Sequence, residues 1–271
     1  LVRQELVGST KLGKVSKFAL FLSEIPMNLK KIYSVAKDPG IDSGVGFRFK
    51  NKTGFFGKYD KNNHYLLLSR YDGNLSESVV ELIRLNDLKV INRWNPEINK
   101  INNRIDKTRD EYLLLDRDLN EYRYKIHAPL LTNDGGLIIH SHGSALVKID
   151  KCNNTVWVND IDHFHHSAEE DIDGNYWIPS RIYPYSIDEK KVGKKYGDFF
   201  DDAITKVSGA GDILYQKSVT QILLDNHLDH LVFSDYVFHG DPIHLNDIEP
   251  VNFDGKYWRK GDVFLSLRSQ N

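Results

Sequence analysis

Three histidines occupy matching places ahead of a repeated segment of the chain. His127 lies seven residues before Asp134, and His166 lies seven residues before Asp173, where Asp134 and Asp173 each open an Asp-Gly turn. His244 opens the stretch "HLNDIEP", with a slightly longer run to its own turn, "DGKYWRKGD". If the repeated segments are arranged around one axis, equivalent residues converge, and the three imidazoles would line a shared site. A lone histidine at a strand start is more often structural, but three in register favour a site.

Basic side chains end the segments that follow these histidines. Arg70, Arg181 and Arg268 each close one segment, and His142 closes another. Imidazoles alone would suit zinc, copper or iron, and "HFHH" at residues 163–166 has the density typical of a metal site. Arginines repel a metal ion, whereas they donate charge-assisted hydrogen bonds to sulfate or phosphate. The residue types therefore favour an oxyanion site, with a metal site as the alternative.

The elements that would position these residues follow one repeated pattern. Four segments contain a turn pair, an apolar run and a terminal basic residue; they are residues 62–70, 134–142, 173–181 and 260–268, with a weaker echo at 110–117. Hairpin patterns follow at 78–94, 144–160 and 202–219. A unit of about 40 residues with about four strands is typical of a β-propeller blade. We therefore expect an all-β propeller with about four blades in this chain, although a sandwich or a barrel also alternates strands and turns.

Two further parts of the chain complete the predicted organisation. Residues 1–43 are predicted to be a helical and extended segment, with a short amphipathic helix over residues 15–25, and residues 44–271 to be the propeller domain. The connections at 95–110 and 183–197 are predicted to be polar loops. Acid pairs such as Glu169-Glu170 and Asp201-Asp202 are weak signals of a glycosidase and are expected to lie in turns or at blade edges.

Composition excludes several classes of protein. A net charge of −2 over 271 residues provides no basic field for nucleic acid or an anionic membrane. The single cysteine, Cys152, excludes an intrachain disulfide and a cysteine-based zinc site. No stretch reaches the ~18–20 apolar residues of a membrane span.

At these residues the sequence resembles the bacterial arylsulfotransferase family that does not use PAPS. The resemblance rests on "HSHGSALVKID", "DHFHHSAEEDIDGNYWIPSR", "DDAITKVSGAGDILYQKSV" and "DPIHLNDIEPV…GDVFLSLR", and it covers residues 110–271 best. It implies a six-bladed propeller that moves a sulfuryl group from a phenolic sulfate ester to another phenol. It also implies a transiently sulfated histidine, no cofactor, and an exported, periplasmic or membrane-anchored bacterial protein. A homodimer is left open by the sequence.

The resemblance assigns site residues one by one. His244 and Asn246 match the family's H-x-N pair, Arg268 matches its strand-end arginine, and His165 and His166 match its paired histidines. We expect His166, His244, Asn246 and Arg268 to be catalytic. His165 is expected to bind substrate, and the internal register adds His127, His142 and Arg181 to it. The candidate aromatic walls of the channel are Trp177, Tyr183 and Phe164.

One departure from the family pattern concerns the nucleophile. The family's sulfated histidine lies in a "QH" segment after the strand that ends in arginine, and no histidine of this chain matches it. The chain begins with Leu1, and its only methionine is Met27. We therefore expect a fragment that is inactive alone and lacks the last blades. Two alternatives are a propeller that binds an anion without catalysis and a metal-dependent propeller lyase or hydrolase.

Overall fold

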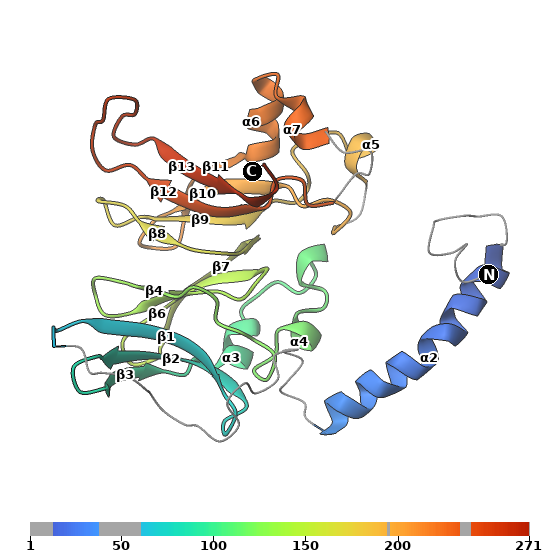
Figure 1. Ribbon diagram of the computed structural model, residues 1–271, viewed down its shortest axis with the longest axis horizontal. Helices are drawn as coiled ribbons and strands as arrows, with labels where there is room; N and C mark the ends of the chain where they lie inside the picture. The colour runs from blue at the N-terminus through green and yellow to red at the C-terminus, as the bar shows by residue number, and fades with distance from the viewer. Residues whose placement is uncertain (1–12, 38–60, 194–195, 234–239, 271) are drawn as a thin grey trace. The chain divides into compact units, whose positions relative to one another are not determined.

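The computed structural model describes residues 13–37, 61–193, 196–233 and 240–270, which belong to two units, Leu1–Gly54 and Phe55–Asn271 (Figure 1). The described residues of the first unit form a helix, α2 (Gly13–Lys37). The helix is longer than the predicted one because Leu29 and Ile32 continue the apolar spacing past Pro26. In the described part of the chain, α2 included, no helix has the length and apolar character needed to cross a membrane.

The second unit is built mainly of antiparallel strands, as an all-β fold requires. The strands are β1 (Tyr65–Asp72), β2 (Glu77–Arg84), β3 (Lys89–Trp94), β4 (Leu130–Leu131), β5 (Leu137–Ile139), β6 (Ser144–Ile149), β7 (Thr155–Phe164), β8 (Glu169–Glu170), β9 (Tyr176–Arg181), β10 (Asp202–Val207), β11 (Ile213–Ser218), β12 (Leu245–Pro250) and β13 (Val263–Leu267). The three predicted hairpins are confirmed as β2–β3, β6–β7 and β10–β11.

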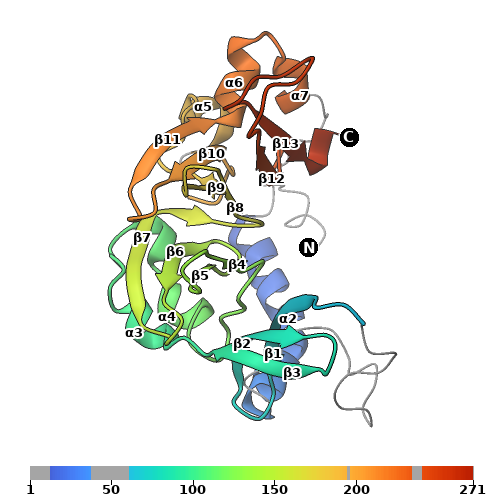
Figure 2. The same ribbon diagram turned by 90° about the vertical axis from the view of Figure 1, so that its left-hand side faces the viewer.

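The strands form meanders that repeat along the chain. Strands β4–β7 form one four-stranded meander and β8–β11 form another, and two residue pairs at the end of β7, His163 with Arg181 and Phe164 with Ser180, join them. Strands β1–β3 and the pair β12–β13 form separate sheets. The four groups follow one another in chain order (Figures 1 and 2). The described strands do not close into a barrel or a propeller.

Successive sheets pack face to face, which explains the apolar runs in the middle strands. On β5, Leu137 and Ile139 pack towards Val80 of β2, whereas Ile138 packs towards Ile178 of β9. On β9, Trp177 faces the opposite side from Ile178 and packs with residues of β12. Strands buried on both faces lose the alternation of apolar and polar residues. The layered packing carries the strand ends of neighbouring sheets close to one another.

Helices replace strands or loops in several predicted places. The echo at 110–117 is not a strand but a 3-10 helix, η1 (Asp110–Tyr112), followed by α4 (Leu115–Asp118). The reason is its spacing: Tyr112 and Leu115 are buried, and the two leucines between them are exposed, which is a helical period rather than a strand period. The connection at 95–110 contains α3 (Ile98–Asn102), whose Ile98 and Ile101 join the core, and the connection at 183–197 contains α5 (Glu189–Val192). Elsewhere the described residues form α6 (Val219–Asp225), α7 (Asp229–Phe233) and η2 (Arg268–Gln270).

Candidate active site

The predicted histidines come together in one cluster. The ring of His166 lies 5.1 Å from that of His165, 5.2 Å from His244, 5.6 Å from His142 and 6.0 Å from His127, measured between ring centres. A sixth imidazole, His140, lies 6.3 Å from His127. The structure therefore brings together the five histidines predicted to form the site and adds one that sequence reasoning missed. His166 is at the centre.

The ends of strands position these rings. His127 and His166 each lie three residues before the first strand of their sheet, β4 and β8, and His244 lies directly before β12. The backbone of His166 has φ +61°, and that of His244 has φ +51°. This left-handed conformation is uncommon for a residue with a side chain, and the surrounding structure must maintain it. Such conformations cluster at functional sites, so the backbone at both histidines supports a site here.

A row of three charged or ionisable side chains crosses the sheet beside the cluster. His163 of β7 is paired with Arg181 of β9, and Arg181 is paired with Asp202 of β10. All three are buried. The guanidinium of Arg181 lies 3.9 Å from the centre of the Phe200 ring, which favours a cation over its face. Arg181 is thus held in the predicted site, with Asp202 as its neighbour.

Several buried nitrogens of the cluster have no hydrogen-bond partner among the residues that the structure describes. They are His140 Nε2, both ring nitrogens of His165, His166 Nε2 and Arg181 Nε. His165 Nε2 lies 3.2 Å from Asp202 Oδ1, but the two do not form a well-aligned hydrogen bond. Buried polar atoms in native proteins are nearly always paired. A concentration of unpaired nitrogens is what a site for a polyoxygenated ligand needs.

Burial keeps the central imidazoles neutral. Burial lowers the pKa of His140 to about 4, and burial with the neighbouring histidines lowers the pKa of His166 to about 3. Burial also lowers the pKa of His165. The neighbouring Asp202 raises this pKa, but its effect is smaller than that of burial. At pH 7 these rings therefore hold one proton each and keep one lone pair. The nitrogen with the lone pair can accept a proton or attack an electrophile.

His244 has a carboxylate partner of its own. Its Nδ1 lies 2.5 Å from Oδ2 of Asp241. A carboxylate at Nδ1 keeps the proton on that nitrogen, so Nε2 carries the lone pair. Sequence reasoning named His244 but not Asp241, although the two are only three residues apart in "DPIH".

The other two residues predicted to be catalytic lie on the same hairpin. Asn246 is half-buried at a bulge in β12, where the register with β13 shifts. Arg268 follows β13, and its backbone N–H donates to the His244 carbonyl at 3.1 Å. Its side chain is exposed, and within the described residues it makes no ion pair. The backbone thus holds Arg268 beside His244 and leaves its guanidinium accessible.

Arg70, the first strand-end arginine of the repeat, forms ion pairs within its own hairpin. Its guanidinium forms ion pairs with Glu81 at 2.9 Å and with Asp72 at 3.1 Å. The side-chain hydrogen bond to Glu81 raises the pKa of Arg70. Its role in the β1–β2 hairpin is therefore structural.

A comparison with known families decides the identity of the chain. The model of the family described as arylsulfotransferase (ASST) matches residues 128–271. The chain belongs to the arylsulfotransferase family. The matched part of the chain includes every predicted site residue except His127, which lies one residue before it. No curated protein sequence matches the chain.

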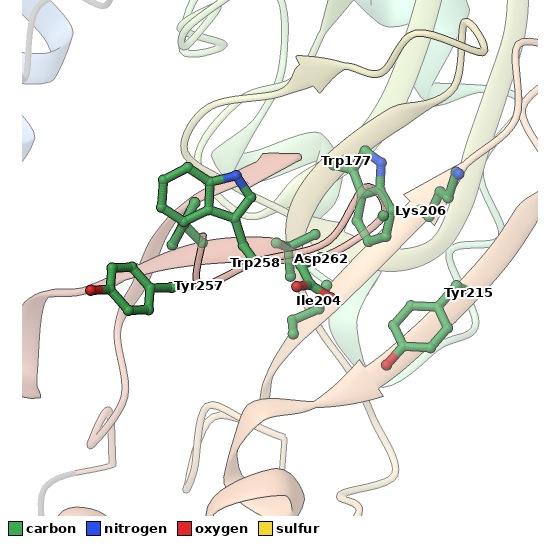
Figure 3. A pocket seen from close by; sticks show the side chains of 10 residues that line it. Trp177, Ile204, Lys206, Tyr215, Tyr257, Trp258 and Asp262 are labelled. Atoms are coloured by element: carbon green, nitrogen blue, oxygen red, sulfur yellow. The ribbon is translucent and has the colours of Figure 1, made fainter. Parts of the chain in front are cut away.

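The three predicted aromatic walls lie in different surroundings. The ring of Tyr183 packs against those of Tyr185 and Tyr196. Phe164 is fully buried in the core between the two meanders. Trp177 lines a groove of about 660 Å³ between β9–β11 and the β12–β13 hairpin, where Figure 3 shows it with Tyr215, Tyr257 and Trp258. Among the residues that the structure describes, no three His, Cys, Asp or Glu side chains are grouped so that they could hold a metal ion.

Proposed function

We propose that this protein is an aryl sulfotransferase that moves a sulfuryl group from a phenolic sulfate ester to another phenol through a sulfohistidine. The observation that carries the proposal is the position of His166, whose ring is surrounded by four other imidazoles and whose buried Nε2 has no partner within the described residues. Membership of the arylsulfotransferase family supports the reaction class.

The proposed transfer has two steps. In the first, a histidine nitrogen forms a bond to sulfur while the ester S–O bond breaks, and the phenol leaves as its phenolate, whose negative charge the hydrogen-bond donors of the site stabilise. In the second, the acceptor phenol gives its proton to an imidazole and its oxygen attacks sulfur, while the N–S bond breaks. No histidine of residues 1–271 matches the family's sulfated histidine, so the proposal gives the present residues the binding and proton-transfer roles.

The geometry suggests how these roles are divided. His244 has Nδ1 fixed by Asp241, so its Nε2 is suited to exchange a proton with the phenol oxygen. Arg268, Asn246 and Arg181 can donate hydrogen bonds to the sulfuryl oxygens. Donors that are already in place as charge develops on the leaving oxygen are usually the largest contribution to such a rate. His127, His142 and His165 surround the position where the sulfuryl group would lie.

We also propose that the face-to-face meanders are propeller blades. The four-stranded repeats β4–β7 and β8–β11 are each buried against the next sheet, and the histidines at their strand ends converge. Convergence of equivalent strand ends is what an arrangement of blades around one axis produces. An exported or membrane-anchored location is a proposal that rests on the family resemblance alone, and a homodimer is left open.

The test uses the full-length protein with p-nitrophenyl sulfate as the donor and a phenol as the acceptor, and nitrophenolate release is the readout. His166→Gln and His244→Gln are each expected to lower acceptor-dependent release by about 10²–10⁴-fold, the contribution typical of a positioned acid or base. His230→Gln, at an exposed position on α7, is the matched control and is expected to keep full activity. Equal release from all three variants would contradict the assignment.

A propeller that binds an anion without catalysis is the second candidate. The unpaired nitrogens of the cluster favour it, because binding of an anion needs only such donors. It predicts that inorganic sulfate binds in calorimetry, that His166→Gln abolishes the binding, and that no aryl sulfate releases its phenol. A metal-dependent lyase or hydrolase would instead lose its activity on treatment with a chelator.

A further inference from the structure

The acid pair Asp201-Asp202 at the start of β10 is divided between two environments. Both carboxylates are buried, with exposed fractions of 1% and 0%. Asp201 accepts hydrogen bonds from the Ser186 N–H and from the Ser218 hydroxyl, each at 2.6 Å. Successive residues of a strand point to opposite faces, so Asp202 faces the histidine cluster. These two hydrogen bonds give the Asp201 carboxylate a structural role. Asp202 makes neither of them.

Asp202 touches three segments that carry the candidate site. Its Oδ2 accepts the Leu245 N–H at 2.7 Å, directly after His244. Its Oδ1 lies 3.2 Å from His165 Nε2, in the segment after β7, and 3.5 Å from Arg181 Nε, at the end of β9. These segments come from three different parts of the chain. One carboxylate is thus in contact with all of them.

We propose that Asp202 is a positioning residue of the active site, which sets the orientation of His165 and Arg181 and fixes the backbone beside His244. The inference deepens the proposed function and rests on it for its catalytic consequence. Asp202 does not face the substrate position itself, because its carboxylate is fully buried behind His165 and Arg181. It acts through the residues that it holds.

The physical argument for His165 concerns its tautomer. A carboxylate beside one ring nitrogen favours the proton on that nitrogen, and the other nitrogen then carries the lone pair. Asp202 therefore favours the proton on Nε2 and leaves the lone pair of His165 on Nδ1, which is buried and has no partner among the described residues.

The argument for Arg181 and for His244 concerns charge and backbone strain. A buried carboxylate is costly unless cations or donors compensate it, and the Leu245 N–H, His165 and Arg181 provide that compensation. Burial raises the pKa of Asp202, but these three groups outweigh it, so the pKa is lowered and the carboxylate is ionised. The hydrogen bond at Leu245 also holds the start of β12, where His244 has its unfavourable positive φ.

The test compares Asp202→Asn with Asp201→Asn in the full chain. Both variants replace a buried, hydrogen-bonded carboxylate by an amide of the same shape. A general effect on folding should therefore be similar in the two variants. We expect Asp202→Asn to lower kcat for sulfuryl transfer by about 10–100-fold, the loss typical when the partner of a functional imidazole is removed. Asp201→Asn is expected to change kcat by less than about threefold. If the two variants lose activity equally, Asp202 has no positioning role.

A second readout does not depend on activity. Long-range nitrogen–proton NMR on ¹⁵N-histidine-labelled protein reports which ring nitrogen of His165 carries the proton. We expect Nε2–H in the natural chain and in Asp201→Asn, and a shift towards Nδ1–H in Asp202→Asn. An unchanged tautomer in Asp202→Asn would overturn the inference.

The two readouts distinguish failure of the inference from failure of the proposed function. If the natural chain transfers no sulfuryl group but the tautomer changes as expected, the proposed function fails and the positioning role stands. If transfer occurs and Asp202→Asn keeps full kcat, the function stands and the positioning role fails. Should Asp202→Asn not fold, Asp202→Glu keeps the charge and displaces it by one methylene, and it is expected to show the same reduced kcat.

Discussion

Acid should destabilise this protein through His140, and the substitution His140→Asn should remove that contribution. His140 is 1% exposed, and its Nδ1 lies 2.9 Å from the Ser141 carbonyl. Burial lowers its pKa from 6.5 to about 4 in the folded chain. Asparagine can keep the hydrogen bond to Ser141 through its amide nitrogen, but it cannot be protonated.

The sign and the size of the effect follow from proton binding. Because the folded pKa lies below the unfolded one, the unfolded chain takes up the proton first as the pH falls below 6.5. The stability that His140 provides is complete above that pH and is lost progressively down to about pH 4. Each pH unit in this interval costs about 1.36 kcal/mol, so a change from pH 7 to pH 5 removes about 2 kcal/mol from the free energy of unfolding.

Urea unfolding at pH 7 and at pH 5 measures this difference. With a slope of about 2–3 kcal/mol per molar urea, ~2 kcal/mol corresponds to about 0.7–1 M in the midpoint. The midpoint of the natural chain should fall between the two pH values by that much more than the midpoint of His140→Asn. His230→Asn, at an exposed position, should behave like the natural chain. Equal shifts in the natural chain and in His140→Asn would refute the assignment of a neutral, buried His140.

Two further predictions test the packing of the meanders and the choice of arginine. Gly211→Ala should destabilise the protein by about 1–3 kcal/mol more than Gly197→Ala in thermal unfolding. Both glycines have positive φ, so the backbone strain is similar, but only a Cβ at position 211 would meet the Trp157 ring, at 2.7 Å. Arg181→Lys should lower kcat/KM about tenfold at unchanged circular dichroism, because lysine loses the planar stacking on Phe200, worth about 1–2 kcal/mol.

The repeat pattern predicted the convergence of the histidine rings better than it predicted the secondary structure of residues 110–117. The register of His127, His166 and His244 could be read from equal spacing to a turn, and their rings do converge. The hairpins could be read from alternation and turn residues. The helical character of residues 110–117 was missed because the tyrosine–leucine run fits either period, and only the burial of Tyr112 and Leu115 decides between them.

The partners of the site residues could not be predicted for a different reason. Arg181 and Asp202 face each other through the antiparallel pairing of β9 and β10, across a connection of twenty residues. The register of that pairing depends on the whole hairpin and not on any local motif. His140 resembles a strand residue in "LIIHSH", where its alternation with His142 is the only signal that it could share the site.

The charge of the cluster is matched to a monoanion. Buried His140, His165 and His166 are neutral at pH 7 because their pKa values are lowered, and Arg181 is partly balanced by Asp202. The cluster thus offers many hydrogen-bond donors but little net positive charge.

A sulfate monoester has one negative charge, whereas a phosphate monoester near neutral pH approaches two. Taking a second charge out of water would need further cations, which the buried part of the cluster does not supply. Neutral imidazoles around one guanidinium therefore favour transfer of a sulfuryl group over transfer of a phosphoryl group.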